Sequence, residues 1–155
     1  MTYEHQLSAF RAKFRVIELS LVKYEHWELS LRPQQLTLGS MVLSVKENFC
    51  TFLELDSETN AEMGRAFADA EGAAKEIFGS VRINILCLML QDPLIHFHIF
   101  PRYDEPKGFL ERTWYDKDWP RPPVLRDIQT NNTTLSAIFR EVSSSRRFVT
   151  DFKAQ

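Results

Sequence analysis

The longest pattern of hydrophobic positions in this chain is helical. It lies in "DSETNAEMGRAFADAEGAAKEIFG" (56–79), where apolar residues recur every three or four positions. The apolar stripe consists of Met63, Phe67, Ala70, Ala74 and Ile77. Asp56 offers a cap for the first turn, and Gly79 is a natural stop after the last turn. The pattern therefore predicts a helix over 56–79, whose alanines favour close packing against a flat neighbour such as a sheet.

Alternating positions and short apolar runs predict the strands. We expect strands near 24–32, 38–45, 81–90 and 94–100. Residues 81–90 are apolar nearly throughout, which predicts burial on both faces of that strand. Pro101 is expected to end the last strand. A short helix near 5–14 and a C-terminal helix within 131–148 complete the elements, and 104–130 is expected to be a long irregular segment.

The order of these elements indicates the fold class. Strands, helix, strands and helix follow one another without the alternation of a parallel α/β sheet. We therefore predict an α+β fold with an antiparallel sheet, a central helix and a C-terminal helix. A length of 155 residues suits a single domain over 1–155.

Composition and charge narrow the range of partners and locations. The formal net charge of −2 argues against a nucleic-acid coat or a polybasic membrane anchor. No apolar run approaches the roughly 18 residues of a membrane span, and the N-terminus does not resemble a secretory signal. Cys50 and Cys87 lie in apolar surroundings without metal-type spacing, so we expect buried free thiols and a cytoplasmic protein.

The stretch "DPLIHFHIFPRYDEP" (92–106) holds two of the four histidines, His96 and His98. Alternate side chains of a strand share a face, so the two imidazoles point the same way, roughly 6.5–7 Å apart at about 3.3 Å per residue. Leu94 and Phe100 share that face; Ile95, Phe97 and Ile99 point the other way, into the core.

Three interpretations of this pair are open. The histidines could line the solvent face of a strand without a function. They could bind a metal, but zinc needs three or four ligands, and His5 and His26 lie far back in the sequence. They could also be catalytic, because a neutral imidazole is a good nucleophile toward phosphorus, and a second histidine can donate to a phosphate oxygen or to the leaving group.

The stretch "LIHFHIFPRY" resembles the signature of the histidine triad (HIT) family, which alternates histidines with apolar residues and often continues into Pro-Arg. On that pattern, His96 falls at the middle, nucleophilic histidine and His98 at the third. Leu94 stands in place of the first histidine, so the triad here is a dyad.

The flanking segments are also similar to the family. In "LGSMVLSVKENFCTFLELDSE", Gly39, Lys46 and Asp56 occupy the family's glycine, basic residue and helix start, and "INILCLML" carries Asn84 where many bacterial members have an asparagine. The likeness covers about residues 20–106, leaving 107–155 as a C-terminal irregular segment and helix.

The turn before the histidines departs from the family. The family often has Gly-Asn there, whereas this chain has Met89-Leu90 followed by Gln91 and Asp92. The departure puts the usual phosphate contacts of that turn in question.

The resemblance implies an activity and a site. HIT proteins are homodimers that hydrolyse or transfer nucleoside monophosphates through a nucleotidyl-histidine, on dinucleoside polyphosphates or nucleoside phosphoramidates, without a cofactor or metal in the covalent step. Here His96 would attack the α-phosphorus, a backbone carbonyl would hold its other ring nitrogen, and His98 would assist. The expected substrate contacts come from Lys46, Asn84, Gln91 and Arg102.

Other roles for these residues stay open at this point. Asn84 could satisfy backbone groups inside the sheet, Gln91 could be a plain turn residue, and Arg102 could pair with Asp104 at the surface. The whole chain could also be a nucleotide-binding protein that has lost turnover, or a metal-binding β protein.

Overall fold

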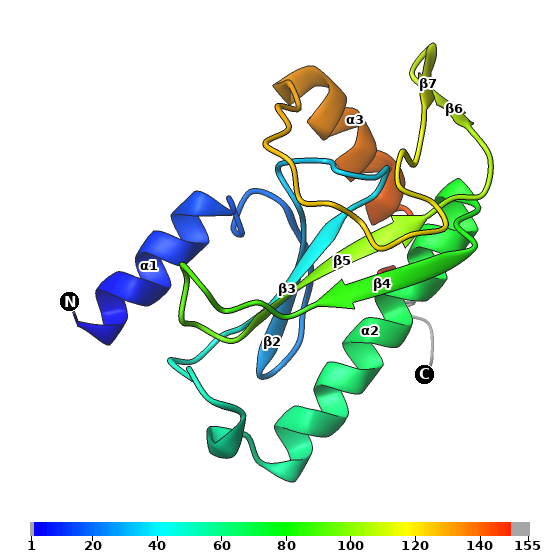
Figure 1. Cartoon of the computed structure of the whole chain (residues 1–155). Helices are drawn as coiled ribbons and strands as arrows, with labels where there is room; N and C mark the ends of the chain where they lie inside the picture. Colours follow the sequence, from blue (N-terminus) through cyan, green and yellow to red (C-terminus); the bar gives the residue numbers. More distant parts are fainter. Residues whose placement is uncertain (1, 150–155) are drawn as a thin grey trace.

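The computed structural model describes residues 2–149. Figure 1 shows an antiparallel sheet with α2 along one face, α1 projecting at the left and α3 at the top of the view. Five strands form the main sheet in the order β1-β2-β3-β5-β4, and every neighbouring pair is antiparallel. The predicted α+β class, with its central and C-terminal helices, is therefore confirmed.

The elements along the chain are α1 (Tyr3–Lys13), β1 (Ser20–Lys23), β2 (Trp27–Leu31), β3 (Met41–Val45), the 3-10 turn η1 (Phe52–Glu54), α2 (Ser57–Phe78), β4 (Arg82–Leu86), β5 (His96–Arg102), β6 (Lys107–Phe109), β7 (Arg112–Trp114) and α3 (Asn132–Ser143). Among these helices none combines the length and apolar character that a bilayer crossing requires.

The central helix α2 forms for the reasons its sequence indicates. The Asp56 carboxylate accepts a hydrogen bond from the Thr59 amide at 2.8 Å, and Gly79 ends the helix with a left-handed φ of 68°. Of the predicted stripe, Ala70 and Ala74 are fully buried, whereas Met63, Phe67 and Ile77 are partly buried against the same core. The buried alanines are Ala66, Ala70, Ala73 and Ala74.

Strand β5 lies inside the sheet, between β3 and β4. His98 is in register with Val42 on one side and Leu86 on the other. The prediction that Pro101 ends this strand is wrong, because β5 continues to Arg102. Pro101 lies beyond the last β3 pair, Met41 with Ile99, so its missing N–H breaks no β3–β5 hydrogen bond.

Strand β4 differs from the fully covered strand predicted over 81–90. It is short and lies at the sheet edge, where Ile85 is 39% exposed, and the chain after Leu86 leaves the sheet. The apolar side chains of this strand are therefore only partly buried by the rest of the chain. The same region corrects the cysteine prediction, since Cys87 is exposed and Cys50 is only half-buried.

The C-terminal part combines predicted and unpredicted structure. Helix α3 begins at an Asn131 cap, whose side chain accepts from the Thr134 amide at 2.8 Å. The segment predicted to be wholly irregular over 104–130 contains the β6–β7 hairpin. The two strands pair only with each other. Each has three residues, which is too short to show an alternating pattern in the sequence.

Gly39 occupies a position where any side chain would be strained. Its φ is +82°, and a Cβ there would lie 3.0 Å from Phe78 Cδ2. We expect Gly39→Ala to lower the free energy of unfolding by about 1–3 kcal/mol, because a left-handed backbone and a close contact both oppose it. Gly64, inside α2 with nothing within 4 Å of its added Cβ, is the matched control. Gly64→Ala should instead stabilise the protein by about 0.5–1 kcal/mol. Urea denaturation measures both, and a destabilised Gly64→Ala would contradict this view of the two positions.

Candidate functional site

His96 and His98 share one face of β5, opposite the face that packs on α2. On the α2 side, Phe97 meets Phe67 edge-on at 5.0 Å between ring centroids. The two imidazoles have ring centroids 5.1 Å apart and nearly perpendicular planes. Both side chains are buried, so the alternative of two histidines on a solvent face is wrong.

The backbone just before β5 fixes the orientation of His96. Its Nδ1 lies 2.6 Å from the carbonyl oxygen of Leu94. A carbonyl only accepts, so Nδ1 carries the proton and Nε2 keeps its lone pair. The ring is also held by Phe10 of α1, 4.9 Å away between centroids. The buried Leu94 side chain adds no polar group, but its carbonyl orients the nucleophile candidate.

His98 has a different partner. The Nε–H of Arg32, which directly follows β2, donates to His98 Nδ1 at 3.3 Å. A second Arg32 hydrogen bond runs from Nη1 to the Gln34 carbonyl at 2.8 Å, and the guanidinium lies 5.4 Å from the Phe100 ring centroid. Arg32 is thus held in place against the histidine.

Burial dominates the protonation of this group of residues. Loss of solvent lowers the pKa of His96. Burial above all, then the positive charge of Arg32 and the nearby His96, together lower the pKa of His98 to about 3. Burial also lowers the pKa of Arg32 to about 10. Both imidazoles are therefore neutral at pH 7, as a nitrogen nucleophile requires.

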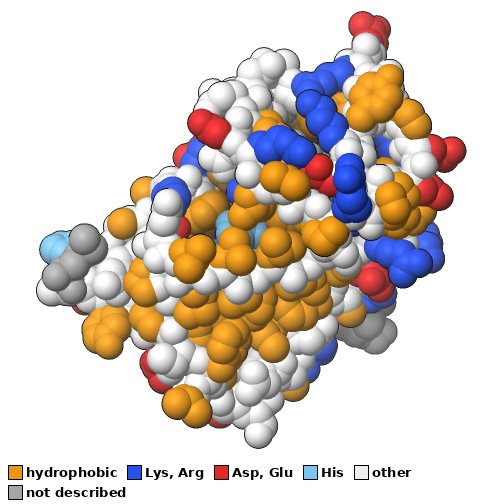
Figure 2. All heavy atoms as spheres, viewed as in Figure 1, with side chains coloured by type: hydrophobic (Ala, Val, Ile, Leu, Met, Phe, Trp, Pro, Cys, Tyr) orange, Lys and Arg blue, Asp and Glu red, His pale blue; other side chains and the backbone are white. Residues whose placement is uncertain are grey.

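A cavity of about 370 Å³ opens beside the two histidines. This volume falls in the range of small-molecule sites. Figure 2 shows histidine atoms in a hollow bordered by hydrophobic side chains. The charged groups that line the cavity are Lys13, Arg32, Asp92, Arg126 and Asp127. Basic groups from α1, from the end of β2 and from the 115–131 segment thus surround one space, which suits an anionic ligand.

Of the four expected substrate contacts, the structure brings only Gln91 to this cavity. Lys46 instead reaches back to the β1–β2 turn, where its Nζ donates to the Tyr24 carbonyl at 2.9 Å. The turn that carries Gln91 also contains Met89, whose φ of 49° is in the region that favours glycine. The backbone there adopts a left-handed conformation although the glycine of the related pattern is missing.

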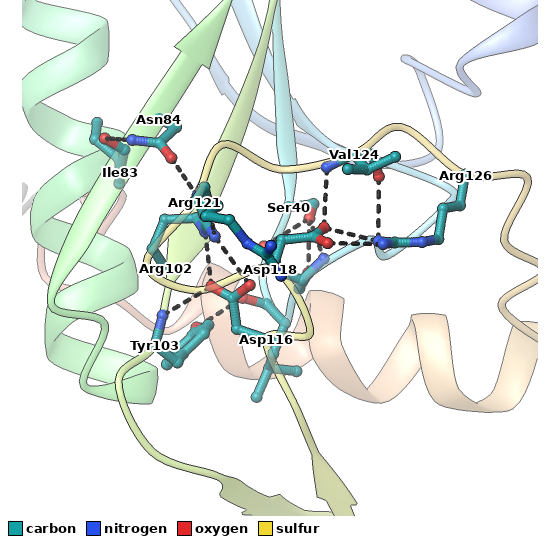
Figure 3. Close-up of polar contacts among 12 residues, drawn as sticks. Ser40, Ile83, Asn84, Arg102, Tyr103, Asp116, Asp118, Arg121, Val124 and Arg126 are labelled. Atoms are coloured by element: carbon teal, nitrogen blue, oxygen red, sulfur yellow. Dashed lines mark hydrogen bonds and ion pairs between the residues drawn. The ribbon is translucent and has the colours of Figure 1, made fainter.

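Asn84 and Arg102 meet each other away from the histidines (Figure 3). Arg102 Nη1 donates to Asn84 Oδ1 at 2.5 Å, and its Nε and Nη2 donate to the Asp116 carboxylate at 2.6 and 3.1 Å. Nη2 also donates to the Arg121 carbonyl at 2.8 Å. The surface pairing of Arg102 with Asp104 is therefore wrong, because Arg102 is buried and bound to Asp116. Asn84 and Arg102 line a separate cavity of about 710 Å³ beneath residues 119–123.

A second ion pair in the same segment carries Arg126 to the histidine cavity. Both Arg126 nitrogens, Nη1 and Nη2, lie 2.7 Å from the Asp118 carboxylate, which also accepts from the Val124 amide (Figure 3). These hydrogen bonds hold the pKa of Asp118 well below its usual range.

Sequence reasoning missed Lys13, Arg32 and Arg126. Arg32 had a usable signal, since it is the last residue of the strand predicted near 24–32, directly before Pro33, and a strand end often presents a polar group. Lys13 is the last residue of α1, and its Nζ binds Asp92 at 2.6 Å. No local pattern marked either Lys13 or Arg126, because their positions depend on contacts with distant residues.

A possible metal-binding group lies elsewhere. Between residues 2 and 149, the one cluster of three or more potential ligands is Glu25, His26 and Glu62, whose ligand atoms all lie within 4.8 Å of one another. Glu62 already accepts from the His26 and Trp27 amides at 2.7 and 3.1 Å. The cluster does not include His96 or His98.

The low pKa of His98 makes the stability of the protein depend on pH. A histidine in the unfolded chain has a pKa of about 6.5, whereas folded His98 has a pKa of about 3. Between these two pH values the unfolded state binds a proton that the folded state does not bind, so lowering the pH favours unfolding. We expect the free energy of unfolding to fall by about 2 kcal/mol from pH 7 to pH 5 through His98 alone. Urea titrations at both pH values should give a smaller fall for His98→Asn than for the wild type. The exposed His5→Asn is the matched control and should keep the wild-type fall; equal falls in all three proteins would contradict the prediction.

No protein-family model and no curated protein sequence matches the chain. Solved structures do match it. A hypothetical histidine triad nucleotide-binding protein from Sulfolobus tokodaii strain7 has a TM-score of 0.63 and 15% identity, with 90% of this chain and 89% of that chain covered. A Hit-like protein involved in cell-cycle regulation from Bartonella henselae has a TM-score of 0.63 and 17% identity, with 87% of this chain and 93% of that chain covered. A histidine triad protein from Bradyrhizobium japonicum has a TM-score of 0.59 and 20% identity, with 83% of this chain and 94% of that chain covered.

The chain is thus an α+β protein with a five-stranded antiparallel sheet and a buried pair of histidines on the inner strand β5. Its fold is that of the histidine triad proteins, as the three structures show.

Proposed function

We propose that this protein is a nucleotide hydrolase or nucleotidyl transferase. Its substrates would be dinucleoside polyphosphates or nucleoside phosphoramidates, attacked at the α-phosphorus by His96. The observation that carries the proposal is the 2.6 Å contact between His96 Nδ1 and the Leu94 carbonyl. It leaves Nε2 as a free lone pair beside a cavity that contains basic side chains.

The proposed reaction has two steps. The lone pair of His96 Nε2 forms a bond to the α-phosphorus while the bond from phosphorus to the leaving group breaks, and the leaving group takes that electron pair. An oxygen leaving group departs as an anion, whereas a nitrogen leaving group also takes up one proton and departs as an amine. The imidazole then bears a positive charge, which the Leu94 carbonyl stabilises through Nδ1–H. Water next attacks the phosphorus, the P–N bond returns its electrons to Nε2, and the nucleoside monophosphate departs with release of one proton.

His98 supports these steps from the same face of β5. Its ring lies 5.1 Å from that of His96, close enough for both to contact one phosphoryl group. It donates a hydrogen bond to a phosphate or leaving-group oxygen, which stabilises charge that grows in the transition state. The rest of the cavity is lined by Gln91, Lys13 and Arg126, which supply donors to the phosphates.

Turnover and the covalent intermediate together test the proposal. The protein is incubated with diadenosine polyphosphates and with an adenosine phosphoramidate, with EDTA present, and quenched at early times for mass spectrometry. We expect nucleoside monophosphate to form and a nucleotidyl group to appear on the His96 peptide. Turnover abolished by EDTA, or metal bound stoichiometrically at the histidines, would overturn it.

A nucleotide-binding protein without turnover is the second candidate. Leu94 favours it, because this buried side chain adds no polar group where the related pattern has a third imidazole. Tight nucleotide binding with no product in the same assay would support this candidate instead.

We also propose that the protein is a homodimer. Strand β4 is a sheet edge, and the apolar side chains of Ile85, Leu88 and Leu90 along and after it are 39%, 41% and 83% exposed. Figure 2 shows this hydrophobic surface near the centre of the molecule. Pairing of two such edges would cover it. Light scattering that gives a monomer mass at micromolar concentration would contradict the proposal.

A further inference from the structure

The two histidines are held in opposite protonation patterns by their partners. The carbonyl at Leu94 requires a proton on His96 Nδ1. Arginine has only donors, so the Nε–H of Arg32 requires a lone pair on His98 Nδ1. A neutral His98 therefore carries its proton on Nε2. His96 offers a lone pair at Nε2, and His98 offers an N–H at the same position of the ring.

A contact with a donor-only side chain also blocks protonation of His98. A proton added at Nδ1 would point at the Nε–H of Arg32, and the guanidinium cannot turn an acceptor toward it. Arg32 is not free to withdraw, because its Nη1 is bound to the Gln34 carbonyl and its plane lies by Phe100. The burial of His98 beside a second imidazole works in the same direction.

We infer that Arg32 is a positioning residue that keeps His98 a neutral Nε2–H donor, so that the site favours leaving groups that depart as anions over those that must depart protonated. The inference rests on the proposed function and deepens it. On this inference the site prefers phosphoanhydrides, such as dinucleoside polyphosphates, to phosphoramidates.

The leaving-group chemistry explains the selection. When His96 Nε2 displaces a nucleoside polyphosphate, the P–O bond breaks toward oxygen, and the product leaves as a phosphate anion, whose last pKa is about 6. A hydrogen bond from His98 is sufficient for that step. When a P–N bond breaks, the electron pair goes to nitrogen. An amide anion is far too basic to leave, so the nitrogen must take up a proton and depart as the neutral amine, whose conjugate acid has a pKa of about 10. A neutral imidazole held by Arg32 cannot supply that proton, because it would have to become an anion.

The other charged groups of the cavity do not replace His98 as an acid. Lys13 is paired with Asp92 at 2.6 Å, and Arg126 is paired with Asp118 at 2.7 Å. Around His98 the charged or titratable groups are thus Arg32 after β2, His96 on β5, Lys13 on α1 and Asp92 in the turn before β5. Only Asp92 among these favours the protonated ring, and Lys13 neutralises it.

Two substitutions at Arg32 separate its chemistry from its bulk. A glutamine amide can either donate to Nδ1 or accept from it, so Arg32→Gln permits a proton on Nδ1. A lysine can only donate and keeps the charge, so Arg32→Lys is expected to retain the wild-type pattern. Arg140→Ala, which removes an exposed arginine from α3, is the matched control.

The first readout is the ratio of kcat/KM for diadenosine tetraphosphate to that for an adenosine phosphoramidate. We expect the wild type to favour the anhydride by about 10²-fold or more, the contribution that proton transfer usually makes. Arg32→Gln should narrow the ratio by about tenfold or more through a higher kcat on the phosphoramidate at pH 6. Arg32→Lys and Arg140→Ala should leave the ratio as in the wild type.

The second readout does not need turnover. Long-range ¹H–¹⁵N spectra of the histidine rings, assigned by comparison with His98→Asn, report which ring nitrogen carries the proton. We expect His98 Nε2–H in the wild type and in Arg32→Lys, and mixed protonation in Arg32→Gln. A proton on His98 Nδ1 in the wild type, or a phosphoramidate used as well as the anhydride, would overturn the inference while leaving nucleophilic His96 intact. Absence of turnover on both substrates, with the Arg32-dependent spectra observed, would overturn the proposed function instead.

Discussion

Replacing His96 by alanine is expected to lower kcat/KM by about 10⁴-fold or more on any substrate that the wild type uses. In the proposed reaction this side chain supplies the electron pair that bonds to phosphorus, and among the described residues that line the cavity no other nitrogen has both a free lone pair and an orienting partner. Rapid-quench assays with the wild type and His96→Ala measure this directly. The covalent nucleotidyl adduct should disappear together with turnover.

His98→Ala is the informative comparison for His96→Ala. It removes a hydrogen-bond donor rather than a bond-forming atom, so we expect a loss of about 10²- to 10³-fold and continued formation of the adduct. His98→Asn, which keeps an N–H donor, should lose less than His98→Ala. Equal losses at His96 and His98, or an adduct formed in His96→Ala, would show that the roles of the two histidines are not as assigned.

The largest effect on stability is expected at Asp116. This carboxylate and the Arg102 guanidinium are each only 2% exposed, and they share two hydrogen bonds of 2.6 and 3.1 Å. Asp116→Ala leaves a buried positive charge without its counter-charge, so the free energy of unfolding should fall by about 3–5 kcal/mol. Urea denaturation followed by tryptophan fluorescence measures the change.

An exposed ion pair provides the control for Asp116. Glu105 is 70% exposed where it pairs with Lys107 at 3.3 Å. Glu105→Ala should cost less than about 1 kcal/mol, because water screens such pairs and replaces them readily. If Asp116→Ala were as mild as Glu105→Ala, the buried pair would not be a major source of stability.

Much of the fold follows from local sequence patterns. The apolar period of α2 and its capping residues lie within one segment, so its start and end could be predicted almost to the residue. The alternation in β5 placed His96 and His98 on one face for the same reason. The strand at 81–90 was predicted too long and too buried, because apolar composition cannot distinguish an inner strand from an edge strand that presents an apolar surface.

The rest of the site depends on contacts between distant parts of the chain. Arg102 and Asp116 are separated by thirteen intervening residues with no repeating pattern, and their ion pair sets the course of that segment. Arg32 and His98 meet only because β2, β3 and β5 are neighbours in the sheet. Such pairings are properties of the assembled sheet, and no window of the sequence contains both partners.

Strand β5 links these two regions of the molecule. His96 is its first residue, and Arg102 is its last. Through Asp116, Arg102 anchors the same segment in which Asp118 holds Arg126 at the wall of the histidine cavity. If the protein binds nucleotide as proposed, a chain weakened at Asp116 would therefore behave as a temperature-sensitive variant. It would bind nucleotide normally in the cold and lose affinity on warming, before the sheet itself melts, as the segment that carries Arg126 detaches.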